Sequence, residues 1–176
     1  CQPGRASPAN GTVTCPVCLA GYVQPQAGSA TCAACPAGQF VPSTQQTVCQ
    51  LCTSGRYSAA PGSNGCTDCQ PGKAQLLPSQ SSCAPCAVGT YSDNFAFSVC
   101  DNCQPGSFAN RTGSVTCQPC AKGSYQPLPG KSVCPLCAPG TSNAAPSQTR
   151  CLPCSPGSAT PYNGSIDCTP CDKGSA

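Results

Sequence analysis

Residues 52–69 read CTSGRYSAAPGSNGCTDC, in which one cysteine is followed by a second 14 residues later and then by a C-x-x-C pair. The same arrangement recurs along the chain, because each C-x-x-C pair follows the previous one by 17 residues. Residues 1–170 form ten tandem 17-residue repeats without an insertion or a deletion, and residues 171–176 begin an eleventh. An unbroken period of this kind predicts small stacked structural units. The cysteines that open and close the ten repeats are Cys1, Cys15, Cys18, Cys32, Cys35, Cys49, Cys52, Cys66, Cys69, Cys83, Cys86, Cys100, Cys103, Cys117, Cys120, Cys134, Cys137, Cys151, Cys154 and Cys168.

The composition predicts a disulfide scaffold. The chain has 21 Cys, 21 Pro and 18 Gly among its 176 residues, and only 7% of its residues are charged. Leu, Ile, Val and Phe together also number 21. A chain with so few large apolar residues does not build one broad hydrophobic core, whereas cysteine at this frequency is typical of disulfide-rich secreted domains.

The same composition argues against several classes of function. The chain has no His and no Glu, the residue types most used in acid–base catalysis, so we expect no catalytic residue, no cofactor and no metal site. Its eight basic residues form no cluster and its net charge is +3, which argues against nucleic acid as a partner. No apolar run is long enough to span a membrane, and no signal peptide is present. We therefore expect a piece of a longer secreted, extracellular chain.

Two further positions keep the 17-residue register. Counting each repeat-opening cysteine as position 1, position 4 is always glycine, which indicates a positive φ or a close backbone contact. Position 6 is mostly apolar and holds five of the nine aromatic residues. The glycines at position 4 are Gly4, Gly21, Gly38, Gly55, Gly72, Gly89, Gly106, Gly123, Gly140, Gly157 and Gly174. Those at position 6 are Ala6, Val23, Phe40, Tyr57, Ala74, Tyr91, Phe108, Tyr125, Ser142, Ala159 and Ala176.

The middle of each repeat has the composition of a turn. Examples are residues 60–63 (APGS), 128–131 (LPGK) and 161–164 (PYNG), where Pro, Asn and Gly each favour turns. A short Val-, Thr- and Ser-rich segment then precedes the next cysteine. Each repeat is thus predicted to be one short, irregular β-hairpin with coil on either side and little or no helix. The expected architecture is an elongated solenoid or rod, with position 6 packed against the disulfide and the adjacent repeat.

The cysteines allow three chemical interpretations. They could form structural disulfides, or they could bind zinc, because C-x2-C-x13-C-x2-C is similar to a four-thiolate zinc ribbon. They could also act as redox centres at C-x-x-C. We favour disulfides, because a zinc array would place five ions in a chain with few compensating charges and no His ligand. Ten redox centres at one fixed period would be redundant.

Counting does not decide how the cysteines pair. Pairing Cys1 with Cys15 and onward leaves Cys171, whose partner would lie beyond residue 176, whereas pairing within each C-x-x-C leaves Cys1. Loop closure favours the first scheme, because closing a loop of about 15 residues is worth ~3 kcal/mol in the chain-entropy description. A bridge within C-x-x-C restrains almost nothing.

The pattern C-x-x-G-x-[YF]-S…PG-S…C-x-x-C resembles the ephrin-receptor-like cysteine-rich repeats of extracellular proteins. Residues 52–66 and 120–134 match it best, and the resemblance covers the whole chain. The repeats are also similar to the first half of tumour-necrosis-factor-receptor cysteine-rich modules. That resemblance implies pairing of Cys52 with Cys66 and of Cys120 with Cys134. The doubly bridged second half of such a module is missing, so binding of that receptor family's ligands is not implied.

Three N-x-[S/T] sequons fall in the predicted mid-repeat turns. They begin at Asn10, Asn110 and Asn163. An exposed turn is where an acceptor asparagine belongs in a secreted protein. The sequence therefore predicts covalently attached glycans at these three sites.

Two functions remain. The first is a structural rod, stalk or fibre, a component of a surface filament, because constant repeat length implies a constant transform from one repeat to the next. Such a chain would associate with itself or with other extracellular or matrix proteins. The second is the ligand-binding ectodomain of a receptor or adhesion protein. Its best candidates lie in repeat 86–102, where Asp93, Asn94, Phe95, Phe97 and Asp101 break the usual turn pattern.

Overall fold

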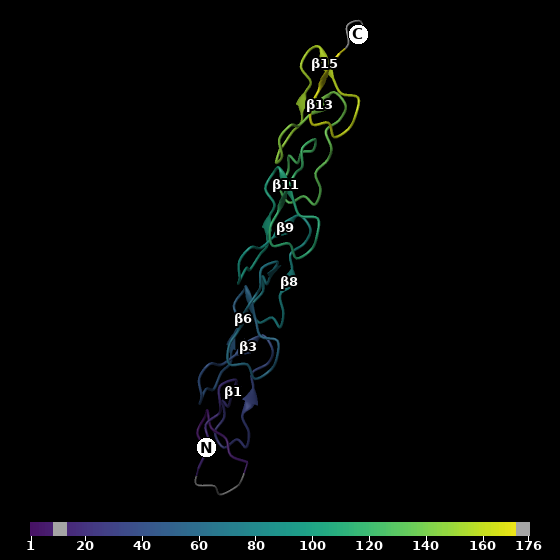
Figure 1. The fold of residues 1–176 in the computed structure, drawn as a ribbon. Coiled ribbons are helices and arrows are strands. Elements are labelled where there is room, and N and C mark those ends of the chain that lie inside the picture. The colour runs from purple at the N-terminus through teal and green to yellow at the C-terminus, as the bar shows by residue number, and fades with distance from the viewer. Residues whose placement is uncertain (9–13, 172–176) are drawn as a thin grey trace. The chain divides into compact units, whose positions relative to one another are not determined.

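The computed structural model describes residues 1–8 and 14–171. Within them lie 16 strands of two residues each and no helix, so the expectation of short hairpins is confirmed (Figure 1). Contacts group the chain into two units, which we describe separately: residues 1–84 with 94–99, and residues 85–93 with 100–176.

The first unit holds seven complete strands. They are β1 (Tyr22–Val23), β2 (Ala33–Ala34), β3 (Gln39–Phe40), β4 (Gln50–Leu51), β5 (Arg56–Tyr57), β6 (Thr67–Asp68) and β7 (Lys73–Ala74). β1 pairs with β2, β3 with β4 and β5 with β6, each time antiparallel. The two residues of β8 (Ala84–Pro85) fall one in each unit.

The second unit repeats the same pairing. Its strands are β9 (Thr90–Tyr91), β10 (Asp101–Asn102), β11 (Ser107–Phe108), β12 (Gln118–Pro119), β13 (Thr141–Ser142), β14 (Leu152–Pro153), β15 (Ser158–Ala159) and β16 (Thr169–Pro170). β9 pairs with β10, β11 with β12, β13 with β14 and β15 with β16, again antiparallel.

All these hairpins share one register. Position 5 faces position 17, and position 6 faces position 16, as in Tyr22 opposite Ala34 and Val23 opposite Ala33. The returning strand is therefore the x-x of C-x-x-C itself. The Val-, Thr- and Ser-rich segment before it, such as residues 114–116, forms no strand. A strand inside C-x-x-C is clamped by a disulfide at each end, which explains why two residues suffice.

Ten disulfides close the repeats, each joining cysteines that are 14 residues apart. They are Cys1–Cys15, Cys18–Cys32, Cys35–Cys49, Cys52–Cys66, Cys69–Cys83, Cys86–Cys100, Cys103–Cys117, Cys120–Cys134, Cys137–Cys151 and Cys154–Cys168. Their Cα atoms lie 5.4 to 5.7 Å apart, within the normal range for a disulfide. Cys171 is free and exposed. The structure thus has the pairing that loop closure favours.

The buried residues are small. The position-1 cysteines from Cys18 to Cys137 are at most 1% exposed, whereas all seven leucines of the chain are exposed. Position 6 is buried at the small residues Ala6, Val23 and Ala74, and Val23 packs against the Cys35–Cys49 disulfide of the next repeat as expected. Where position 6 is aromatic, position 7 is the more deeply buried: Ser92 and Ala109 are 0% and 2% exposed. The aromatic residues at position 6 are only half-buried. Sulfur and backbone therefore form most of the interior, in place of a conventional apolar core.

Candidate functional site

A set of three backbone hydrogen bonds recurs at the junctions between repeats inside each unit. The N–H at position 4 donates to the carbonyl at position 7 of the next repeat, as in Gly21 to Val41 at 2.9 Å. The N–H at position 7 donates to position 12 of the next repeat, as in Val41 to Ser63 at 3.2 Å. The third bond runs back from position 11 to the carbonyl of the preceding position-1 cysteine, as in Gly62 to Cys35 at 2.8 Å.

The same three bonds occur within the second unit. There Gly106 donates to Gln126 at 2.8 Å, Gln126 to Gln148 at 2.9 Å, and Ser147 to Cys120 at 2.9 Å. The third bond also explains why residues 94–99 group with the first unit, since the Ala96 N–H donates to the Cys69 carbonyl. Because these bonds join main-chain atoms, each junction is specified by spacing and tolerates a change of side chain.

Glycine at position 4 serves a contact that spans two repeats. A Cβ on Gly21 would lie 2.0 Å from the Gly62 carbonyl oxygen, and one on Gly106 would lie 2.2 Å from that of Ser147. Real Cβ atoms do not approach a backbone oxygen so closely. The φ at Gly21 and Gly106 is also positive, at 88° and 81°. Both reasons inferred from sequence, a positive φ and a close backbone approach, therefore apply.

Position 11 lies in the left-handed region in every described repeat, yet four of these residues are not glycine. They are Gln45, Ser79, Ala96 and Ser147, with φ of 60° or 61°. After three of the four, position 12 is Gln, whose amide donates to the carbonyl at position 10, as Gln148 does to Pro146 at 3.0 Å. Where position 11 is glycine, a position-12 Ser instead donates to position 9, as Ser63 does to Ala60.

A further glutamine set was missed by the sequence reasoning. Gln24, Gln75 and Gln126 occupy position 7 in every third repeat. Each amide donates to the carbonyl seven residues later, and each amide oxygen accepts the N–H two residues later. These bonds brace the mid-repeat loop, and of the three side chains that of Gln126 is the buried one. A search for a 51-residue period at position 7 would have found them.

Two of the three sequon asparagines lie in the described residues. Asn110 and Asn163 are both exposed, and Asn163 precedes Gly164 in a mid-repeat turn. Asn10 lies outside the described residues.

The candidate ligand residues of repeat 86–102 are divided between the units. Asn94, Phe95 and Phe97 belong to the first unit, whereas Asp93 and Asp101 belong to the second. Phe95 is 62% exposed, and the Phe97 carbonyl accepts the Gln75 N–H in the recurrent junction bond. Phe97 therefore has a structural contact, and the exposed aromatic ring of the set is Phe95.

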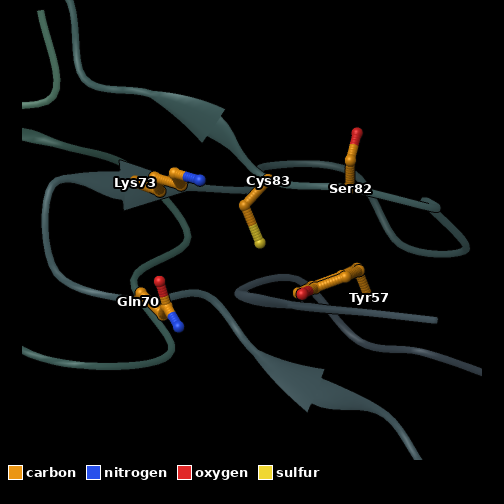
Figure 2. A pocket seen from close by; sticks show the side chains of 5 residues that line it. All are labelled: Tyr57, Gln70, Lys73, Ser82 and Cys83. Atoms are coloured by element: carbon orange, nitrogen blue, oxygen red, sulfur yellow. The ribbon is translucent and has the colours of Figure 1, made fainter. Parts of the chain in front are cut away.

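A hollow of about 110 Å³ lies beside the Cys69–Cys83 disulfide. Figure 2 shows the Cys83 sulfur among Lys73, Gln70 and Tyr57, with Ser82 nearby. Sites for drug-sized ligands measure roughly 300–1,000 Å³, so this hollow is too small for one. In the described part of the chain, no group of three or more Cys, Asp or Glu could hold a metal ion, and no helix is long and apolar enough to cross a membrane.

Comparison with known proteins places these repeats in a family. The sequence model described as "Tyrosine-protein kinase ephrin type A/B receptor-like" matches residues 4–46, 75–115 and 106–147. A search of curated proteins finds no match. Disulfide-closed repeats with such a match indicate an extracellular, receptor-like cysteine-rich segment. With more than half of its residues matched, the chain belongs to the ephrin type A/B receptor-like cysteine-rich family.

Proposed function

We propose that this chain is a structural extracellular segment, a rod, stalk or fibre built from disulfide-closed repeats. The observation that carries the proposal is the set of three junction hydrogen bonds, which recurs with unchanged spacing between repeats inside each unit. Every junction within a unit uses main-chain atoms in the same register. Successive repeats within a unit are therefore related by the same rotation and translation. A constant transform is what a regular extended assembly requires.

The interior supports the same function. Disulfides form most of the buried interior, and glycines make the close contacts between repeats. The side chains at most other positions can therefore vary without loss of the fold. The absence of His and Glu from the sequence supports a role without catalysis. We therefore assign no enzymatic activity to the segment, and expect it to associate with itself or with other extracellular proteins.

Electron microscopy of the purified, oxidised chain tests this function. We expect extended particles or filaments with a regular repeat along their length. The control is the same protein reduced and alkylated, which should lose the regular particles because the loops are no longer closed. Compact, dispersed globules in the oxidised sample would contradict the proposal.

The alternative is a ligand-binding ectodomain, which the exposed ring of Phe95 favours. A protein partner would bury an aromatic residue of this kind as an anchor. The discriminating measurement is binding of extracellular protein partners to the chain and to its Phe95→Ala variant, with Tyr162→Ala, 74% exposed in the native chain, as the matched control. Saturable binding lost in Phe95→Ala alone would support the ectodomain function.

We also propose that Asn110 and Asn163 carry N-glycans, because both side chains are exposed. Expression in a eukaryotic secretory host should give a mass that falls by one glycan in each of Asn110→Gln and Asn163→Gln. An unchanged mass in either variant would remove that site.

A further inference from the structure

Gly65 is a glycine that the fold does not need. The other described glycines have positive φ, whereas Gly65 does not, and a Cβ added to Gly65 would meet no atom within 4 Å. Gly65 is at position 14, where other repeats carry Thr, Val, Ser, Arg or Asp. Neither backbone conformation nor packing therefore accounts for glycine here.

Because Gly65 has no side chain, the main-chain nitrogen that follows Asn64 is sterically unhindered. Both residues are exposed, and they lie in a bend between the mid-repeat turn and Cys66. No described residue accepts a hydrogen bond from the Gly65 N–H. The Asn64 side chain likewise forms no hydrogen bond with a described residue. A main-chain nitrogen without a partner or a flanking side chain is free to approach the carboxamide that precedes it.

We propose that Asn64–Gly65 is a site of spontaneous deamidation, at which this chain acquires an isoaspartyl or aspartyl residue with age. The Gly65 nitrogen forms a bond to the Asn64 side-chain carbonyl carbon, the carbon–nitrogen bond of the amide breaks, and ammonia leaves with the proton that the Gly65 nitrogen gives up. Water then opens the resulting cyclic imide at either carbonyl. The products are a normal aspartate or an isoaspartate whose main chain runs through the former side chain.

A second Asn–Gly pair in the described chain provides an internal comparison. The Gly164 N–H donates to the Cys137 carbonyl at 2.8 Å, as one of the recurrent junction bonds, and Gly164 is held at a φ of 76°. Attack on Asn163 requires that bond to break and the turn to open. We expect Asn163 to react more slowly than Asn64 by about tenfold or more, which corresponds to about 1.4 kcal/mol. The pair Asn10–Gly11 lies outside the described residues.

The reaction at Asn64 leaves the fold intact. The nearest junction bonds are those of the Gly62 N–H and the Ser63 carbonyl, and both end before Asn64. The Cys52–Cys66 disulfide closes the loop on the other side. The product adds one negative charge at an exposed position to a chain whose net charge is +3. Charge, and in the isoaspartate the main-chain path, are changed at the surface of repeat 52–68 alone.

The experiment is incubation of the oxidised chain at mildly alkaline pH, followed by peptide mapping and mass spectrometry at Asn64 and Asn163. The protein should come from an oxidising host compartment that attaches no N-glycans, so that Asn163 is unmodified at the start. We expect isoaspartate to accumulate at Asn64 about tenfold faster than at Asn163. In the reduced, alkylated and unfolded chain the two rates should become equal, because the junction bond is gone.

The variant Gly65→Ala separates this chemistry from structure. It should slow deamidation of Asn64 without lowering the midpoint of thermal unfolding. Equal rates at Asn64 and Asn163 in the folded protein would overturn the proposal, as would an Asn64 that reacts only after unfolding. Deamidation of Gly65→Ala at the native rate would do the same.

Discussion

Gly21 and Gly62, two repeats apart, lie so close that a Cβ on Gly21 would stand 2.0 Å from the carbonyl oxygen of Gly62. The Gly62 N–H meanwhile bonds to Cys35 in the intervening repeat. One mid-repeat turn thus touches both of the repeats that precede it. Within a unit, each repeat is therefore coupled to its second neighbour as well as its first, and the loss of one contact is felt over three repeats.

The first prediction compares two glycines that both have positive φ, Gly21 and Gly28. Gly21→Ala should lower the free energy of unfolding by more than ~3 kcal/mol, because it adds a clash with main-chain atoms to the cost of a left-handed alanine. Gly28→Ala, with a φ of 75° and no atom within 4 Å of the new Cβ, should cost about 1 kcal/mol. Thermal unfolding followed by circular dichroism measures both. Equal losses would show that conformation alone, and not contact, selects glycine at position 4.

The second prediction concerns the residues that adopt the left-handed region without being glycine. Ser147→Gly should stabilise the chain by about 0.5–1 kcal/mol, because relief of the strained φ of 61° exceeds the entropy that glycine adds to the unfolded state. Ser98→Gly is the matched control, since Ser98 is exposed and its φ is not positive. That control should be destabilising. Calorimetric unfolding temperatures that move in the same direction in both variants would argue against strain at position 11.

The third prediction tests the glutamine brace. Gln126 is 5% exposed, donates to the Val133 carbonyl at 2.7 Å and accepts the Leu128 N–H at 3.1 Å. Gln126→Ala should cost roughly 2 kcal/mol, because it removes two hydrogen bonds of a buried side chain and leaves two partly buried main-chain groups without partners. Gln118→Ala, at an exposed strand residue, should change the unfolding free energy by less than about 0.5 kcal/mol. Amide hydrogen exchange of Leu128 reads the same effect locally and should accelerate only in Gln126→Ala.

The fourth prediction concerns the disulfide at Cys120 and Cys134. The double variant Cys120→Ser/Cys134→Ser should unfold with a free energy lower by about 3 kcal/mol, the value for opening a loop of this length. Chemical denaturation in the absence of reductant measures the loss. The matched control is Cys171→Ser, since Cys171 is the free cysteine and should contribute nothing. A comparable loss in the control would contradict the pairing.

Much of the fold could be predicted from the sequence because the sequence repeats with a fixed 17-residue period. The repeat length, the absence of helix and a backbone reason for Gly38 and its equivalents follow from spacing and glycine chemistry alone. The position of the returning strand could not be predicted. Positions 16 and 17 carry Ala, Pro, Gln or Asp far more often than β-branched residues, so no strand propensity marks them.

The buried face was also hard to predict. Where position 6 is aromatic, the deeper side chain is the one beside it, such as Ser58 beside Tyr57, because side chains of an extended segment alternate between faces. Asn143 is buried with its amide donating to the Ser124 carbonyl. Polar side chains can be buried at position 7 because their hydrogen bonds are satisfied, whereas a hydrophobicity scale predicts that polar residues are exposed. The contact between Gly21 and Gly62 was equally hidden, since the two lie 41 residues apart.

The way each loop is closed decides how the molecule responds to being pulled. In repeat 35–51 the Cα atoms of Cys35 and Cys49 are 5.7 Å apart, although 14 residues separate them along the chain. Tension applied to the two ends would cross from one cysteine to the other through their sulfur atoms, and the residues between them would carry no load. Only the short segments between successive disulfides could be extended. The oxidised chain would therefore reach its maximum length after little extension and then resist further stretching.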